Sequence, residues 1–181
     1  MATLSASSFI SLDGVVEAPE RWHMQYFSPE LGELTFKQLA GAEAILLGRQ
    51  THDDWLGFWP NQDAATNPFA GLLNQLPKYV ASTTLTSSPW AGTTVLNGEA
   101  QRTVADLKGE IGGEISVLGS ATLTRSLLNA GLVDELRLVI DPIIVGSGSR
   151  LLVDLKETAL SLTETVVLPG GVLSLIYRTR A

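Results

Sequence analysis

Two kinds of hydrophobic pattern follow one another along this sequence of 181 residues, and their order constrains the fold more than any other feature. Up to about residue 142, short apolar runs of strand length alternate with segments whose apolar residues recur at helical spacing. The last part holds two β-rich runs, 160–168 and 172–178, joined by the hairpin signature Pro169-Gly170-Gly171. Several β-α units followed by an antiparallel ribbon predict an α/β fold, with a mixed, mostly parallel sheet and helices on both of its faces.

Prolines, caps and glycines mark where the helices begin and end. Ser28-Pro29 and Asn67-Pro68 each combine an N-cap residue with a proline at the first helical position. We expect Ser120 to cap a further helix and Gly131 to close it. No linker or repeat divides the chain, which is interpreted as one domain, 1–181. The other expected elements are helices at 29–40, 68–76 and 103–108, and strands at 4–12, 44–47, 78–82, 93–96, 114–118 and around 136–140.

Composition narrows the classes of function. The net charge of −7 would repel a phosphate backbone or an anionic membrane, so we expect no nucleic-acid partner and no membrane partner. The chain has no cysteine, which excludes disulfides and thiolate chemistry, and its two histidines are too few for a histidine-based metal site. We therefore predict no metal site. His52 follows Thr51 directly, and we expect its side chain on the surface of the helix. The N-terminus does not resemble a secretory signal and no run could span a bilayer, so a cytoplasmic protein is expected.

Two strand-to-helix junctions carry residues suited to an anion. Ligands of α/β sheets bind where strands end and helices begin, because free N–H groups and the positive end of the helix dipole meet there. At the first junction Gly48 permits the turn, Thr51 can cap the helix, and Arg49 adds donors suited to phosphate oxygens. At the second, a glycine and small residues let a ligand approach the backbone closely. These residues are Gly119, Ser120, Ala121 and Thr122.

A third strand end, Ser82-Thr83-Thr84, offers only hydroxyl groups. Each junction by itself also fits an ordinary structural cap, but three at successive strand ends favour a nucleotide-type ligand. The glycines of Val145–Arg150 do not make a dinucleotide fingerprint, because Leu151 stands where the third glycine belongs. A tight loop is predicted there instead.

Several segments resemble a known family. They are SLDGVVEAPERWH, LLGRQTHDDW, PKYVASTTL, ISVLGSATLTRSLLNAGLVDELRLVIDPIIVGSGSRLL and the closing β-ribbon, and they cover nearly the whole chain. Together they resemble the dihydrofolate reductase-like superfamily, specifically the C-terminal reductase domain of bifunctional riboflavin-biosynthesis enzymes (the RibD C-terminal family). The most specific piece is GLVDEL followed by PIIVGSG.

The resemblance implies a dihydrofolate reductase-like three-layer α/β/α sandwich that works as an NADPH-dependent reductase. In such a site the junction Gly48–Thr51 holds cofactor phosphates, and Gly119–Thr122 lies against the pyrophosphate and the nicotinamide. The implied substrate is a small heterocycle, a pterin or an aminopyrimidine of riboflavin-type metabolism. Family members commonly carry Ser-Arg where this chain has Ser82-Thr83, so NADH is possible as well, and Ser120 replaces the second glycine of a Gly-Gly turn.

The substrate side offers fewer candidates. Asp13 follows the first strand and is a candidate to hold a substrate amine or relay a proton, although Asp13-Gly14 fits a plain turn equally well. His23 is a candidate proton donor, although a lone loop histidine is more often incidental. Trp22 lies in the same segment. Trp55 and Trp59 could wall a flat ring or simply pack the core.

The main hypothesis is therefore an NAD(P)H-dependent reductase that transfers hydride to a small heterocycle. One alternative is a non-catalytic nucleotide-binding or regulatory protein of the same fold, and another is a flavin- or deazaflavin-dependent reductase. A homodimer is also expected, because two-fold dimers are the commonest assembly and the C-terminal ribbon offers an apolar patch or a sheet edge.

Overall fold

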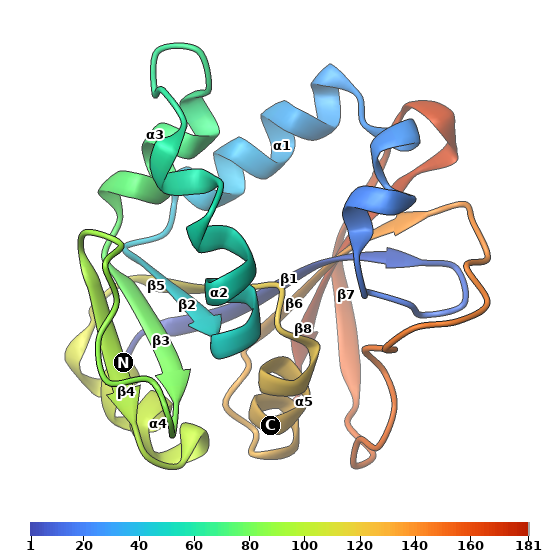
Figure 1. The fold of residues 1–181 in the computed structure, drawn as a ribbon. Helices are drawn as coiled ribbons and strands as arrows, with labels where there is room; N and C mark the ends of the chain where they lie inside the picture. The colour runs from blue at the N-terminus through green and yellow to red at the C-terminus, as the bar shows by residue number, and fades with distance from the viewer. Residues whose placement is uncertain (181) are drawn as a thin grey trace.

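The structure, a computed structural model that describes residues 1–180, contains one eight-stranded sheet of strand order β4-β3-β2-β5-β1-β6-β8-β7 (Figure 1). All pairs among β1 to β6 are parallel, whereas β8 pairs antiparallel with both β6 and β7. The predicted mixed, mostly parallel sheet with an antiparallel C-terminal hairpin is confirmed. Ala181, the last residue of the predicted domain, lies outside the described residues. The strands are β1 (Thr3–Ser11), β2 (Ala44–Gly48), β3 (Lys78–Ser82), β4 (Thr93–Asn97), β5 (Glu114–Leu118), β6 (Glu135–Asp141), β7 (Leu160–Val167) and β8 (Leu173–Thr179).

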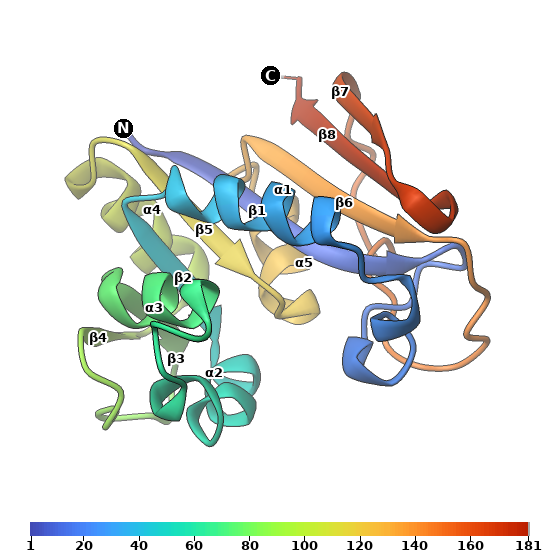
Figure 2. The ribbon, with the colours of Figure 1, turned by 90° about the horizontal axis from the view of Figure 1, so that it is seen from above.

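Helices cover both faces of the sheet and make three layers. Figures 1 and 2 show α1 and α3 on one face, α4 and α5 on the other, and α2 where β2 ends. Every helix within residues 1–180 is too short or too polar to cross a bilayer. The helices are α1 (Pro29–Ala40), α2 (Arg49–Leu56), α3 (Pro68–Gln75), α4 (Ala100–Glu110) and α5 (Ala121–Asn129), and the 3₁₀ turns are Pro19–Arg21, Met24–Tyr26, Trp59–Asn61 and Pro169–Gly171.

The helix signals predicted from proline, cap and glycine are largely confirmed. Ser28 accepts a hydrogen bond from Leu31 N at 3.2 Å at the start of α1, and Asn67 caps α3 in the same way. Gly131 has φ 68°, the left-handed conformation of a residue that closes a helix. The helix predicted at 103–108 extends from Ala100 to Glu110 in the structure. The prediction missed its first turn because that turn is mostly polar and carries no apolar periodicity.

Two apolar layers hold the sheet between the helices. The layer under α4 and α5 is built from aliphatic side chains of β1, β5 and β6, and the layer under α1 and α3 from those of β2 and β3. All five residues of β2 are buried, which confirms the prediction of a strand covered on both faces. Each fully buried leucine or isoleucine contributes roughly 1.5–3 kcal/mol of transfer free energy.

Lys78, the first residue of β3, is fully buried without a carboxylate partner. Its ammonium donates hydrogen bonds to the carbonyls of Leu73, Asn74 and Leu76 at 2.9, 3.2 and 2.8 Å, and lies 5.2 Å from the Trp90 ring centroid. It therefore satisfies carbonyls that α3 leaves free at its C-terminus. Burial lowers the pKa of Lys78 to about 8.

Candidate functional site

The two glycine junctions lie side by side at the carboxyl ends of β2 and β5. These strands pair in parallel, with Leu46 opposite Val117, so the turns that follow them are neighbours. The Ser120 hydroxyl joins the two turns, because it accepts a hydrogen bond from Gly48 N at 2.8 Å and lies 2.6 Å from the Thr51 hydroxyl oxygen. The structure thus brings together residues about 70 positions apart.

Close packing leaves little room for a side chain at either glycine. A Cβ at Gly48 would lie 2.6 Å from Ser120 Oγ, and one at Gly119 would lie 3.2 Å from Thr51 Cγ2. Gly119 also has φ +61°, which favours glycine. The predicted cap at Thr51 is wrong, because α2 begins at Arg49 and Thr51 already lies inside the helix. Ser120 is the N-cap residue of α5, as predicted, but its hydroxyl bonds Gly48 of β2 rather than its own helix.

No side chain caps the N-terminus of α2 or of α5. By contrast, Ser28 and Asn67 cap α1 and α3. The start of α4 also lacks a side-chain cap, but it follows β4 at the outer edge of the sheet. Two neighbouring helix starts without side-chain acceptors create a positive potential suited to an anion. Ala121 and Thr122, the first residues of α5, lie in this region.

Arg49 links the first junction to the third strand end. Its half-exposed guanidinium donates from Nε to Asp53 Oδ2 at 3.1 Å and from Nη1 to the Thr84 hydroxyl. Ser82 Oγ accepts a hydrogen bond from Thr84 N at 3.2 Å, so this hydroxyl stabilises the turn, while Thr83 is exposed. The strand ends of β5, β2 and β3 therefore present a continuous row of donors.

β1 extends beyond its neighbour β5 and leaves one of its edges open. The last pair between the two strands is Ser7 with Leu118, whereas β6 accompanies β1 as far as Ser11, opposite Asp141. Within the described residues, positions 8–11 therefore have a strand neighbour on one side only, and Figure 2 shows β1 running on past the end of β5. This open edge adjoins the Gly119 turn and offers backbone groups to a flat ligand.

A buried histidine–aspartate pair lies where β1 and β6 end. His23 is 3% exposed and Asp141 is 0% exposed. His23 Nδ1 lies 2.7 Å from Asp141 Oδ2, and the imidazole stacks on Phe9 with ring centroids 3.9 Å apart. Packing and a hydrogen bond hold His23 in place, and both its role as a proton donor and the alternative that it has no functional role stay predictions. Sequence reasoning missed Asp141, whose signal was a carboxylate at the end of an apolar strand, next to Pro142.

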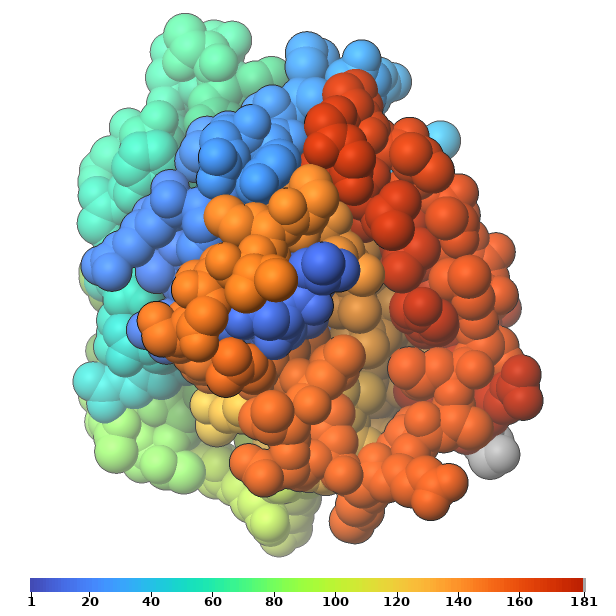
Figure 3. Space-filling view, turned by 90° about the vertical axis from the view of Figure 1, so that its right-hand side faces the viewer, coloured from blue at the N-terminus to red at the C-terminus, as the bar shows by residue number. Residues whose placement is uncertain are grey.

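Asp13 ties the turn after β1 to the loop after β6. Its carboxylate accepts hydrogen bonds from the Ser11 hydroxyl at 2.7 Å, Val145 N at 3.0 Å and Gly146 N at 2.9 Å. The Ser11 hydroxyl and then these backbone N–H groups lower the pKa of Asp13 to about 2. Arg150 adds an ion pair at 3.4 Å, and Figure 3 shows the loop (orange) packed around the turn (blue).

These contacts give Asp13 a structural task, and the alternative of a plain turn at Asp13-Gly14 fits the structure. The carboxylate is ionised at neutral pH, so it has no proton to donate. Its predicted role toward a substrate stays a prediction. The tight loop predicted at 145–150 is confirmed, and it turns at two glycines with positive φ.

The aromatic candidates occupy two separate surroundings. Trp22 is buried beside His23 and donates from its indole N–H to the Glu17 carbonyl at 2.9 Å. Trp55 and Trp59 meet edge to face, with centroids 5.8 Å apart, in a cluster packed against β2 and β3. Of the two interpretations given to Trp55 and Trp59, core packing agrees better with this arrangement.

The predicted surface position of His52 is wrong. The side chain is 1% exposed, with Nδ1 2.9 Å from Asp53 Oδ1 and Nε2 2.8 Å from Ser88 Oγ. Its ring lies 6.5 Å from that of Trp90, because this side of α2 faces the core of the molecule.

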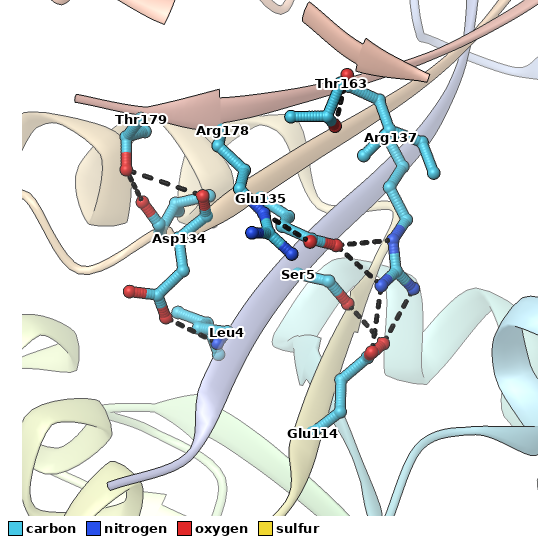
Figure 4. A network of polar contacts seen from close by, with 11 residues as sticks. Leu4, Ser5, Glu114, Asp134, Glu135, Arg137, Thr163, Arg178 and Thr179 are labelled. Carbon is cyan, nitrogen blue, oxygen red and sulfur yellow. Dashed lines mark hydrogen bonds and ion pairs between the residues drawn. The ribbon is translucent and has the colours of Figure 1, made fainter. Parts of the chain in front are cut away.

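A hollow of about 460 Å³ lies at the opposite end of the parallel strands, next to Met1. Its charged groups are already paired, Lys108 with Asp134 at 2.6 Å and Arg178 with Glu135 at 3.1 Å, as Figure 4 shows for the network around Glu135. Because these charges satisfy one another, we place the candidate site at the carboxyl ends of the strands. Among residues 1–180, no three His, Asp or Glu side chains are grouped so as to hold a metal ion.

Comparison with known proteins identifies the family. The model of the RibD C-terminal domain matches residues 2–174. This chain belongs to the RibD C-terminal domain family. The Bacillus subtilis protein YyaP is 31% identical to this RibD C-terminal domain protein over 174 residues, which are 93% of this chain and 90% of YyaP.

Solved structures show that the fold is that of RibD-like proteins. A putative riboflavin biosynthesis protein from Shewanella sp. PV-4 superposes with a TM-score of 0.80 at 20% identity, over 99% of both chains. A diaminohydroxyphosphoribosylaminopyrimidine deaminase/5-amino-6-(5-phosphoribosylamino)uracil reductase from Thermotoga maritima superposes with a TM-score of 0.68 at 12% identity, over 99% of this chain and 57% of the other. The dihydrofolate reductase-like three-layer fold implied by the sequence is therefore confirmed.

Proposed function

We propose that this RibD C-terminal domain protein is a reductase that binds NADPH, or NADH, and transfers hydride to a small heterocycle, a pterin or an aminopyrimidine. The observation that carries the proposal is the pair of adjacent helix starts at Gly48 and Gly119. Both lack side-chain caps, Ser120 joins them, and Arg49 flanks them. Backbone N–H groups at such ends suit a diphosphate.

The residues of the site fit such a cofactor. The first-turn N–H groups of α2 and α5 would bind the diphosphate, and Arg49 with Thr83 would face the phosphate that distinguishes NADPH from NADH. Displacing the exposed Asp53 from Arg49 costs little, because surface ion pairs contribute only about 0–1 kcal/mol. Because Thr83 is neutral, we expect NADH to bind as well as NADPH. NADPH should bind more tightly, because Arg49 would face its additional phosphate.

When bound, the cofactor supplies a hydride, and the protein supplies position and exclusion of water. The open edge of β1 is the place for the flat reacting ring, next to the Gly119 turn. The buried side chains of Trp22 and His23 at the end of β1 exclude water from that side. An aminopyrimidine is the first acceptor to try, because the Thermotoga maritima protein is a 5-amino-6-(5-phosphoribosylamino)uracil reductase by its name.

A fluorescence titration with NADPH and NADH tests the proposal, with the four tryptophans as reporters. We expect saturable binding, and Arg49→Ala should weaken NADPH binding by about 1–3 kcal/mol, the range for a charge-assisted hydrogen bond. Arg180→Ala is the matched control, because Arg180 is exposed at the far end of the ribbon. No saturable change with either cofactor would refute the proposal.

The non-catalytic alternative has an observation of its own: the Asp13 carboxylate already accepts hydrogen bonds from Ser11, Val145 and Gly146 and pairs with Arg150. Cofactor binding without oxidation by any acceptor would favour it.

A further inference from the structure

His23 and Asp141 form a buried pair that the binding of a cofactor does not explain. They are separated by 118 residues in sequence and join the segment before α1 to the end of β6 through one contact of 2.7 Å. Both side chains are almost fully removed from water, with 4% and 0% exposed. A carboxylate that accepts from Nδ1–H fixes the orientation of the imidazole and leaves Nε2 as the nitrogen that faces other groups.

Each partner also keeps one buried polar atom without a hydrogen bond. These atoms are His23 Nε2 and Asp141 Oδ1. Buried polar atoms in native proteins are nearly always paired, because an unpaired one costs about 1–3 kcal/mol. The chain's other histidine shows the usual arrangement, since both ring nitrogens of buried His52 have partners. The vacant Nε2 is therefore the feature to explain.

The ring of His23 lies at the end of β1 that extends beyond β5, and from this we infer that Nε2 faces the open edge of that strand. The imidazole stacks on Phe9 of β1 at an interplanar angle of 20°, so it lies above that strand. Its Nδ1 faces Asp141 on β6, and Nε2, on the other side of the ring, faces away from β6. On that side of β1 the neighbouring strand has ended at Leu118, which is where the reacting ring of a substrate would lie.

We propose that His23 is the proton donor to the substrate and that Asp141 is the residue that positions it. This inference rests on the proposed reductase function. Hydride from the reduced nicotinamide would form a C–H bond at the carbon of a C=N bond, and the π pair would move to nitrogen. The nitrogen would take the proton from protonated His23 Nε2, whose N–H electrons return to the ring. Neutral His23 would then regain a proton from water, so that C=N becomes CH–NH and the nicotinamide is oxidised.

Phe27 provides the cover that a substrate must displace. Its ring meets that of His23 edge to face at 6.3 Å and lies over Gly32, where a Cβ would come within 3.0 Å of it. Half of its surface remains exposed, so rotation of one side chain would uncover the imidazole from outside. The substrate class that fits has a C=N bond within a flat heterocycle or attached to one, since its nitrogen would supply the acceptor that Nε2 lacks.

Steady-state kinetics with NADPH test this role, with dihydrofolate and 5-amino-6-(5-phosphoribosylamino)uracil as the acceptors. His23→Gln should lower kcat by about 10²–10⁴-fold, the usual contribution of general acid catalysis, and change KM only a few-fold. Added imidazole should restore part of kcat in His23→Gly. Lys37→Gln is the control, because Lys37 is exposed in the last turn of α1, and its kcat should stay close to that of the wild type.

Asp141→Asn separates proton donation from folding. It keeps the shape of the pair but removes the carboxylate that orients the imidazole, so kcat should fall about tenfold while NADPH binding is unchanged. If His23→Gln does not fold, the kcat of Asp141→Asn tests the proposed role of the pair instead. If the wild type is active and kcat is unchanged in these variants, the inference about His23 is overturned and the reductase function still stands. A wild type that binds NADPH but reduces neither acceptor overturns both, and one that binds no cofactor refutes the proposed function first.

Discussion

At the scale of single residues, the buried surroundings of Lys78 disfavour its charged form. The pKa of Lys78 falls from an ordinary 10.5 to about 8 because the side chain is buried. Between these values the folded protein releases the proton while the unfolded chain still holds it. The unfolded state then binds more protons, so the stability of the folded state rises with pH across this window. Below about pH 8 both states are protonated and the full cost of the buried charge remains.

Replacing Lys78 with Met removes this dependence. The free energy of unfolding of the wild type, relative to Lys78→Met, should increase on the order of 1–3 kcal/mol between pH 7.5 and pH 10. Urea unfolding at a series of pH values measures both proteins. Parallel curves for the two would show that Lys78 keeps an ordinary pKa in the fold.

The pKa of Asp13 is lowered as well, but for a carboxyl group this means that the fold favours the charged form. Its lowered pKa stabilises the fold above the ordinary value of 3.8, and that contribution is lost as the pH falls from 3.8 toward 2. A carboxylate that stays ionised anchors a loop well and donates no proton at neutral pH. Of the two candidate catalytic residues of the sequence, Asp13 therefore holds the loop, and only His23 is left as a proposed proton donor.

At the scale of elements, the close contact of two turns depends on Gly48. Its φ is −77°, so glycine is needed there for space and not for backbone conformation. A Cβ would lie 2.6 Å from Ser120 Oγ and 2.9 Å from Ser120 Cβ, and would push the serine off the Gly48 N–H. Gly48→Ala should destabilise the protein by about 1–3 kcal/mol and weaken NADPH binding, because the neighbouring helix starts would separate.

Gly57→Ala is the control from the other end of the same helix. It has nothing within 4 Å of its Cβ position, so alanine should be neutral or stabilise by about 0.4–1 kcal/mol through the unfolded chain. Thermal unfolding and the NADPH titration compare the two variants. Equal behaviour of both would contradict the proposed packing of the turns.

The elements could be predicted from sequence far better than the contacts between them. Ser28-Pro29, Asn67-Pro68 and Gly131 act through their own backbone, so local signals placed these helix ends correctly. The hydrogen bond from Gly48 to Ser120 and the pair of His23 with Asp141 join residues 72 and 118 positions apart. Such contacts follow from strand order and register, which periodicity does not encode. That is why the bond of the Ser120 hydroxyl to β2 was not predicted and Asp141 was missed.

At the scale of the whole molecule, self-association stays a prediction. β7 is an edge strand, and its Leu162 and Val167 are 52% and 73% exposed, which is the kind of surface a second copy covers. Light scattering that gives twice the 19.3 kDa chain mass would support a dimer.

The two parts of the sheet, parallel and antiparallel, are joined by a chain of charges at the amino ends of the strands (Figure 4). Arg137 of β6 binds Glu114 of β5 with both Nη atoms, at 2.7 and 2.8 Å, and binds Glu135 at 2.8 Å. Arg178 of β8 extends the chain by bonding Glu135 at 3.1 Å. Arg137 is only 11% exposed and lies between two carboxylates, so its charge allows both to be buried.

Arg137→Met should destabilise the protein by about 3–5 kcal/mol, because it leaves Glu114 and Glu135 partly buried without their common partner. Arg178→Met is the matched control: its side chain is 67% exposed and makes one bond to Glu135, so its loss should cost no more than about 1 kcal/mol. Urea unfolding of both variants at neutral pH gives the comparison. Similar losses for the two would mean that the burial of Glu114 and Glu135 does not depend on Arg137 as their common partner. A large loss for Arg137→Met alone, with NADPH binding unchanged in the folded fraction, would show that this end of the sheet supports the fold while the opposite end binds the cofactor.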